Sequence, residues 1–129
     1  RSLREIPGYM QHMDVCLLCY ALTDYTRYIF PLKLHEYLAT GRPVVGSDIR
    51  TLRDFSSTVR IAHDVEGWCA AIDASLAPAE RSSERAEERR RVARAYDWNI
   101  ITARIAEHLC DRLGGDTSER LRAALGGKS

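Results

Sequence analysis

Three short segments stand out in the pattern of hydrophobic and polar positions along the chain. Residues 15–20 form a continuous apolar run, residues 43–47 are short and apolar, and residues 58–62 are a third strand candidate that contains Arg60. A continuous apolar run of six residues is typical of a strand that is buried on both faces of a parallel sheet. We therefore predict three strands over these ranges.

Between the first two of these segments, apolar residues recur with the period of a helix. Leu34, Tyr37 and Leu38 recur at the spacing of one helix face, and Gly41 follows where a left-handed C-terminal cap belongs. This pattern predicts a helix over residues 31–40. The other predicted helices are residues 7–13, a turn at 51–55, residues 65–76 with Asp64 as N-cap, a charged helix within 80–95, and residues 98–113, which follow Asp97 and end at Gly114-Gly115.

Strands that alternate with helices indicate a parallel sheet with right-handed crossovers. The predicted fold class is therefore α/β, a Rossmann-like three-layer parallel sheet with extra C-terminal helices. Residues 21–30 show no clear period, and we predict a loop there. We assign residues 1–115 to one domain and residues 116–129 to a C-terminal tail. Three strands are few for a doubly wound domain, so we expect further sequence on the N-terminal side.

Composition and charge limit the classes of protein to which the chain can belong. The chain has 129 residues, of which 45% are hydrophobic and 29% are charged, which is ordinary for one globular domain. The net charge of +1 gives no overall attraction to nucleic acid. The chain starts at Arg1, no charged-then-apolar leader follows, and no apolar run approaches the ~18 residues of a membrane span. We expect a cytoplasmic fragment of a longer protein, whose parent could lie at the inner face of the membrane.

The cysteines and histidines do not suggest a metal site. Cys16 and Cys19 form a lone C-x-x-C, and residues three apart in a strand point to opposite faces of the sheet. We predict that both are small buried hydrophobes in a reducing compartment. The four histidines show no metal spacing, although His35 could reach a cleft, so we predict neither a metal nor a cofactor.

Residues 80–95 are crowded with charges of both signs. Glu87 and Arg91 have the spacing of a favourable helical ion pair. The run Arg89-Arg90-Arg91 could contact phosphate or anionic lipid. Because acidic residues are interleaved with it, we predict a solvated helix face instead.

Candidate chemistry belongs at the carboxyl ends of the strands, where open α/β sheets bind ligands. Here these are the loops after Tyr20, Ser47 and Ala62. The helix predicted over residues 31–40 begins there, and its free N–H groups, its dipole and Lys33 suit a phosphate. The chain contains neither G-x-G-x-x-G nor a Walker motif, which disfavours dinucleotide enzymes and P-loop kinases.

Glu36 is the carboxylate of this helix. It lies opposite Leu34 and Leu38, where it could accept two hydrogen bonds from the vicinal hydroxyls of a ribose. Periodicity alone favours a simpler interpretation, a solvated glutamate opposite the core face.

A resemblance to a known family favours the ligand-binding interpretation of Glu36 over the solvated one. Residues 31–45 read P-L-K-L-H-E-Y-L-A-T-G-R-P-V-V. This segment closely resembles the P-x-K-x-x-E-Y-x-A-x-G-x-P-V-V segment of retaining GT-B glycosyltransferases of the "glycosyl transferases group one" family, especially members that build bacterial surface polysaccharides. The segments at residues 6–10, 14–15 and 95–98 are similar to weaker motifs of the same family, so the resemblance covers residues 6–109.

The resemblance implies that the chain is the C-terminal part of a nucleotide-sugar-binding domain. The donor would be a UDP- or GDP-linked sugar, transferred to an acceptor hydroxyl without an obligatory metal. Tyr28 stands where many members have an earlier glutamate, so the sugar contact usually given to that glutamate is unassigned here. The implied donor site comprises Glu36 for the ribose hydroxyls, the backbone of Phe30, Pro31, Leu32 and Lys33 for the diphosphate, and Tyr28 and Ile29 for the sugar.

The same resemblance implies that an N-terminal acceptor-binding domain is missing and that the fragment alone is inactive. Apolar surface left open by the missing part could drive self-association. Two alternatives stay open. A receiver- or flavodoxin-like module would want acids clustered at strand ends, and Asp14 and Asp48 form no such cluster in the sequence. A sugar-nucleotide epimerase of GT-B fold would need several catalytic acids and histidines that the chain does not show.

Overall fold

A computed structural model describes residues 2–113, 115, 119, 120 and 123. These residues divide into two compact units, Arg1–Arg94 and Ala95–Ser129. The predicted boundary between residues 115 and 116 and most of the predicted tail lie outside the described residues, so that division stays a prediction.

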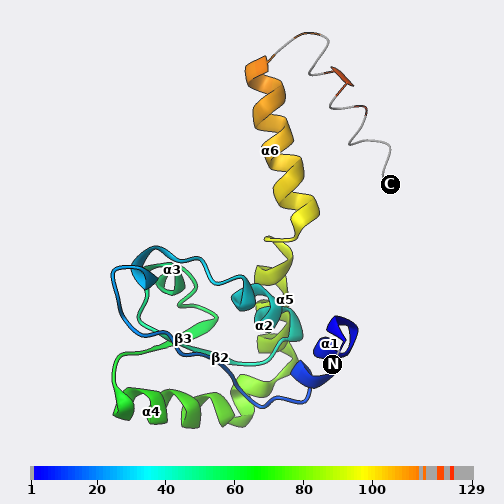
Figure 1. Ribbon diagram of the computed structural model, residues 1–129. Coiled ribbons are helices and arrows are strands. Elements are labelled where there is room, and N and C mark those ends of the chain that lie inside the picture. The colour runs from blue at the N-terminus through cyan, green and yellow to red at the C-terminus, as the bar shows by residue number, and fades with distance from the viewer. Residues whose placement is uncertain (1, 114, 116–118, 121–122, 124–129) are drawn as a thin grey trace. The chain divides into compact units, whose positions relative to one another are not determined.

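The first unit contains a parallel three-stranded sheet, as predicted. Its strands are β1 (Cys16–Leu18), β2 (Val44–Ser47) and β3 (Val59–Ala62), in the order β1-β2-β3. Helix α4 (Val65–Leu76) packs on β2 and β3. Helices α2 (Leu32–Thr40) and α3 (Arg50–Arg53) lie on the other side of the sheet, and α5 (Ser83–Arg94) packs against α2 (Figure 1). The α/β class and the layered arrangement agree with the prediction from the sequence.

The first strand differs from the prediction in length and in burial. It spans three residues rather than residues 15–20, and Leu17 at its centre is 42% exposed. The reason is that β1 is an edge strand, paired only with β2 among the described residues, and α4 covers β2 and β3. All four residues of β2, by contrast, are buried. Cys19, just beyond β1, is also exposed, so the prediction that both cysteines of the C-x-x-C are buried holds for Cys16 alone.

Helix α2 (Leu32–Thr40) forms where the sequence predicts it. Leu34 and Leu38 are completely buried in the core. Gly41 ends the helix in the left-handed conformation, at φ 78°, and its N–H donates to the carbonyl of Leu38 over 2.9 Å.

The remaining elements of this unit include its two longest helices, α4 and α5, of 12 residues each. Asp64 caps α4 by accepting a hydrogen bond of 2.7 Å from the N–H of Gly67, as predicted. The segment predicted as a loop, residues 21–30, contains a short 3-10 helix. The other elements are the helices α1 (Ile6–Met10), α3 (Arg50–Arg53), α4 (Val65–Leu76) and α5 (Ser83–Arg94), and the 3-10 helices η1 (Leu3–Glu5), η2 (Thr26–Tyr28) and η3 (Pro78–Arg81).

Helix α5 is not the purely solvated helix that its charges predict. The side chain of Arg89 is 2% exposed and forms an ion pair with Glu80. Arg89 also donates to the carbonyls of Glu80 (2.8 Å) and Gly41 (3.3 Å), which packs α5 against the end of α2. Glu87, expected to pair with Arg91, instead lies near Arg90 (3.7 Å) and pairs with Arg94. A charged helix can therefore pack closely when its arginines find carboxylates and backbone carbonyls.

The second unit contains α6 (Trp98–Leu113). Asp97 accepts a hydrogen bond of 2.8 Å from the N–H of Asn99 at its start. Trp98, Ile105 and Leu109 of the predicted apolar stripe are 66%, 53% and 48% exposed. Gly114 lies outside the described residues. None of the described helices is long and apolar enough to cross a bilayer.

Candidate functional site

The carboxyl ends of the three strands meet at one edge of the sheet, because all pairings are parallel. The segment from β1 to α2, residues 19–31, crosses this edge. Thr26, buried within it, donates to the carbonyl of Ala21 (2.6 Å) and accepts from the N–H of Thr23 (2.8 Å). Thr51 of α3 donates to the carbonyl of Ile29 over 2.6 Å. These bonds hold the segment, whose one regular element is the short η2, along a defined path.

The N-terminus of α2 opens at this edge. Pro31 is the N-cap residue, in an extended conformation, and no side chain caps the helix. The N–H of Leu34 donates to the carbonyl of Pro31 over 3.0 Å, but the N–H groups of Leu32 and Lys33, at the start of the helix, have no intrahelical acceptor and remain available. Both residues are exposed, and Leu32 is 63% exposed. The helix thus presents N–H donors, the positive end of its dipole and an ammonium group together.

Glu36 lies one turn further along the exposed side of α2. It borders an open groove of about 370 Å³ between α1 and α2, whose walls are mainly apolar. Ile6, Pro7 and Met10 of α1 form the opposite wall. The sequence placed Glu36 on the face away from the core but gave no indication of this groove, because it depends on how α1 packs beside α2.

An aromatic cluster supports the backbone just before α2. Phe30 stacks on His35 at 5.3 Å between ring centroids, and Phe55 meets both rings edge-on. Burial lowers the pKa of His35, which favours a neutral imidazole in this cluster. His35 is therefore part of the packing beneath Phe30.

The other predicted site residues divide into exposed and packed ones. Tyr28 is 75% exposed and Phe30 46%, so both rings are accessible at the sheet edge. Pro31 is buried, and Ile29 packs partly against the core. These two can therefore face a ligand with their backbone only. Phe30, Leu32, Lys33 and Glu36 are all exposed, with Lys33 and Glu36 one turn apart on α2, and Tyr28 ends η2 just before them.

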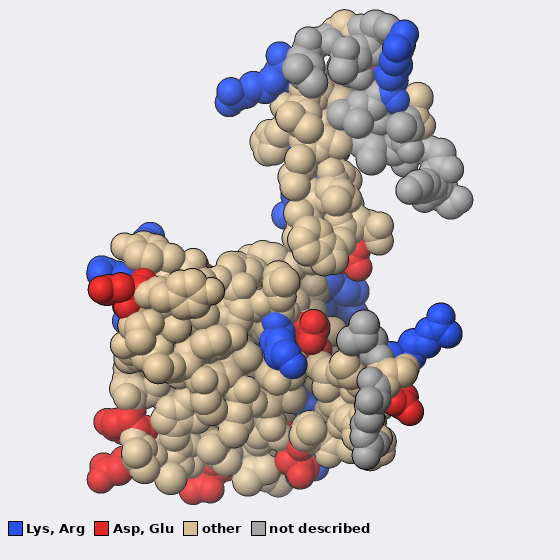
Figure 2. Space-filling model, viewed as in Figure 1, with Lys and Arg blue, Asp and Glu red and all other residues tan. Residues whose placement is uncertain are grey.

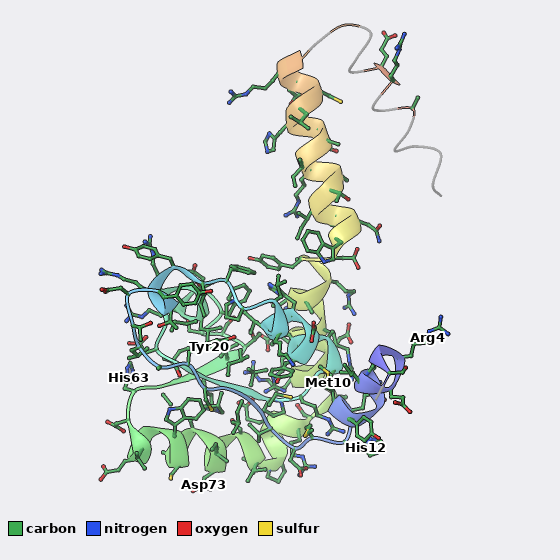
Figure 3. The ribbon with its side chains drawn as sticks, in the orientation of Figure 1. Arg4, Met10, His12, Tyr20, His63 and Asp73 are labelled. Carbon is green, nitrogen blue, oxygen red and sulfur yellow. The ribbon has the colours of Figure 1, made fainter. Side chains whose placement is uncertain are left out.

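A polar cluster that the sequence did not single out joins the ends of β2 and β3. Asp48 accepts two hydrogen bonds from Arg53 (2.5 and 2.7 Å) and lies 3.1 Å from Nδ1 of His63. The hydrogen bonds from Arg53, together with its charge, hold the pKa of Asp48 below its usual value. Ser47 accepts a 2.8 Å hydrogen bond from the N–H of Tyr20, and Figure 3 shows Tyr20 and His63 on this side of the fold. The sequence places Asp48 and His63 directly after predicted strands, but only the order of the strands in the sheet shows that the two residues lie together.

Metal ligands do not gather in the structure. Among the described residues, no group of three or more histidine, cysteine or carboxylate side chains is arranged to hold a metal ion. Burial raises the pKa of the Cys16 thiol, so it is held as a neutral group.

Comparison with known proteins gives one informative match. No family model matches the chain, and no solved structure matches it. The chain is 32% identical over 111 residues to the "Putative teichuronic acid biosynthesis glycosyltransferase TuaH" of Bacillus subtilis (strain 168). The match covers 81% of this chain and 27% of that protein, so the chain spans about a quarter of the length of the relative. This similarity supports the relationship to glycosyltransferases that residues 31–45 indicate.

Proposed function

We propose that the chain is part of the donor-binding domain of a retaining GT-B glycosyltransferase that transfers a sugar from a UDP- or GDP-linked donor to an acceptor hydroxyl. The observation that carries the proposal is the open first turn of α2, with Lys33 in that turn and Glu36 one turn further on the same exposed surface. The similarity to a glycosyltransferase of teichuronic acid biosynthesis supports it and extends it to polysaccharide biosynthesis.

In this proposal the diphosphate binds at the start of α2. The N–H groups of Leu32 and Lys33 donate to phosphate oxygens, and the ammonium group of Lys33 adds a full charge. The same groups stabilise the negative charge that develops on the leaving diphosphate in the transition state. The aromatic packing beneath Phe30 keeps the backbone at this point in one conformation.

Glu36 accepts hydrogen bonds from the two ribose hydroxyls in this arrangement. The groove between α1 and α2 gives the nucleoside an apolar wall beside Glu36, in Ile6, Pro7 and Met10. On the other side, the sugar would lie toward Tyr28 and the backbone of Ile29.

Acceptor binding belongs to sequence outside this chain in the proposal, and a complete enzyme needs that N-terminal domain. The proposed location is the cytoplasm or, for a longer parent, the inner face of the membrane. No large patch of one sign of charge is visible on the face drawn in Figure 2, so that face gives no support to a nucleic-acid partner.

A receiver-like module is disfavoured by the placement of its acids. Asp48 lies at the carboxyl edge and is engaged by Arg53 and His63. Asp14 precedes β1, at the opposite edge, and pairs with Arg81 over 2.8 Å. The two carboxylates therefore do not form the acidic cluster that such a module requires.

The proposal is tested by titrating the chain with UDP, GDP and their sugar conjugates while following backbone amide shifts by NMR. Amides of residues 28–36 should shift saturably with one nucleotide. Glu36→Gln should weaken that binding by about tenfold or more, because the acceptor loses its charge and the amide keeps one acceptor oxygen in place of two. Glu107→Gln, an exposed mid-helix glutamate of α6, is the matched control and should leave the affinity unchanged.

Binding that is equally weakened by both substitutions would contradict the role of Glu36. Absence of shifts with every nucleotide, both for this chain and for a longer parent that supplies the acceptor domain, would refute the glycosyltransferase proposal. Binding of an intact nucleotide sugar by such a parent, with conversion of the sugar but no transfer, would support the epimerase alternative.

A further inference from the structure

A second hollow lies at the opposite edge of the sheet from the first turn of α2. It is open to solvent and has a volume of about 730 Å³, within the usual range for small-molecule sites. Its walls come from the segment after α1, the residues around the C-terminal end of α2, η3 and α5. Asp14 and Pro43, which border it, precede β1 and β2, so the strands run away from this hollow toward the carboxyl edge. His12, which also lines it, is labelled in Figure 3 beside α1, across the fold from Tyr20 and His63.

Positive charge dominates the wall of this hollow. Three arginines line it, Arg42, Arg81 and Arg90, against the single carboxylate of Asp14. Asp14 is paired with Arg81, and Glu87 lies 3.7 Å from Arg90 without lining the hollow. Arg42 has no carboxylate within 4.0 Å among the described residues and is half-buried. A guanidinium that faces a cavity without a carboxylate partner is a natural ligand for an oxyanion.

Two of these arginines are held in place by the backbone. Arg42 donates to the carbonyl of Gln11, and Arg90 donates to the carbonyl of Thr40 over 3.2 Å. The guanidinium of Arg90 also lies directly against Gly41, since a Cβ atom there would be 2.9 Å from its Nη2. Each guanidinium carries five N–H donors, so one backbone bond fixes its position and leaves others for a ligand. The fixed positions reduce the entropy that binding would otherwise cost.

We propose that this hollow binds the oxyanion of an acidic ligand, either the carboxylate of an acidic saccharide or a phosphate group. Arg42 is the principal anion contact, with Arg81 and Arg90 beside it. The hollow adjoins the groove beside Glu36, with which it shares Gln11, Ala39 and Thr40, but its three arginines do not line that groove. The inference does not depend on the proposed glycosyltransferase function.

The test uses the 129-residue chain and three probes at constant ionic strength: inorganic phosphate, glucuronate and uncharged glucose. Binding is followed by NMR through the amides of His12 and Gly41, which line the hollow but not the groove beside Glu36, and through the amide of Lys33 at the donor site. Phosphate or glucuronate should shift the hollow amides saturably, and glucose should not. The anion that binds more tightly identifies the source of the oxyanion.

Arg42→Gln should weaken this binding by about tenfold, as expected for the loss of one charge-assisted contact. Arg42→Lys, which keeps the charge but not the fork of donors, should have an intermediate effect. Arg91→Gln is the matched control, because Arg91 is an exposed arginine of α5 that lines a different, acidic hollow. If Arg42→Gln does not fold, Arg81→Gln takes its place, since that side chain is exposed.

The proposal is overturned if neither anion produces a saturable shift at the hollow. It is also overturned if the anions shift Lys33 instead of the hollow amides, or if Arg91→Gln weakens binding as much as the substitutions at the hollow.

Discussion

The buried ion pair between Arg89 and Glu80 gives the sharpest prediction of stability. Arg89 is 2% exposed and Glu80 17%. Burial alone would raise the pKa of Glu80, but Arg85, Arg60 and Arg89 together lower it, so Glu80 is ionised in the folded protein. Glu80→Gln keeps the shape of the side chain and removes its charge, which leaves a buried guanidinium without a carboxylate.

The expected loss follows from what remains around Arg89. Removing one partner of a buried pair costs roughly 3–5 kcal/mol. Arg89 keeps two carbonyl acceptors, of Glu80 and Gly41, which argues for the lower end, about 3 kcal/mol. Arg89→Met leaves no buried charge, because Glu80 still has Arg60 at 2.8 Å and some contact with solvent. We expect a loss of about 1–2 kcal/mol for that substitution, from the two carbonyls left without a donor.

Urea denaturation of the two single variants and of the double variant measures these values. The double variant should cost about as much as Arg89→Met alone, because it no longer buries an unpaired guanidinium, which corresponds to a coupling of about 3 kcal/mol. As a control, Glu84→Gln changes an exposed glutamate of α5 and should alter the free energy of unfolding by less than about 0.5 kcal/mol. A loss below about 1 kcal/mol for Glu80→Gln would show that Arg89 does not depend on this carboxylate and would refute the reasoning.

Three further predictions concern other parts of the chain. The pKa of Asp48 is lower in the folded than in the unfolded chain, so its contribution to stability is present above the unfolded value of about 4 and is lost as the pH falls through the folded value. Asp48→Asn should therefore flatten the acid limb of a stability–pH curve, and an unchanged limb would contradict the role of the Arg53 contact. Gly46→Ala should destabilise the chain by about 1–3 kcal/mol in urea titrations, because a Cβ atom there would collide with Leu52; a neutral result would mean that α3 can move away from β2. Leu17→Lys should reduce self-association measured by light scattering, since it places a charge at the open edge of the sheet, and undiminished association would exclude this edge as the contact.

The elements that the sequence predicted well are those whose signals are local. Helix α2 follows from the spacing of Leu34 and Leu38 and from Gly41, and the cap of α4 follows from Asp64. The exposure of Leu17 could not be predicted in the same way. An apolar run indicates a strand, but whether both faces are covered depends on which other elements pack beside it.

The other differences between the predictions and the structure arise from contacts between separate elements of the fold. Arg89 looks like one of three solvated arginines until η3 brings Glu80, nine residues earlier, against it. For the candidate site, the positions of Lys33 and Glu36 on α2 follow from helix geometry. The groove beside Glu36 and the contact between Asp48 and His63 arise only when α1 and β3 take their places, and no local pattern encodes them.

The packing of α5 against the C-terminal end of α2 has a consequence for the first turn of α2. Arg89 and Arg90 donate to the carbonyls of Gly41 and Thr40, so cations neutralise the negative pole of the helix. An ordinary N-cap side chain contributes about 1 kcal/mol, and Pro31 provides none. Helix α2 is held at its C-terminal end by α5 and in the core by Leu34 and Leu38. It therefore stays helical although the N–H groups of Leu32 and Lys33 have no acceptor within the helix. In the proposed donor complex, the diphosphate supplies the acceptors and the negative charge for these N–H groups, so that donor binding and completion of the helix would be a single event.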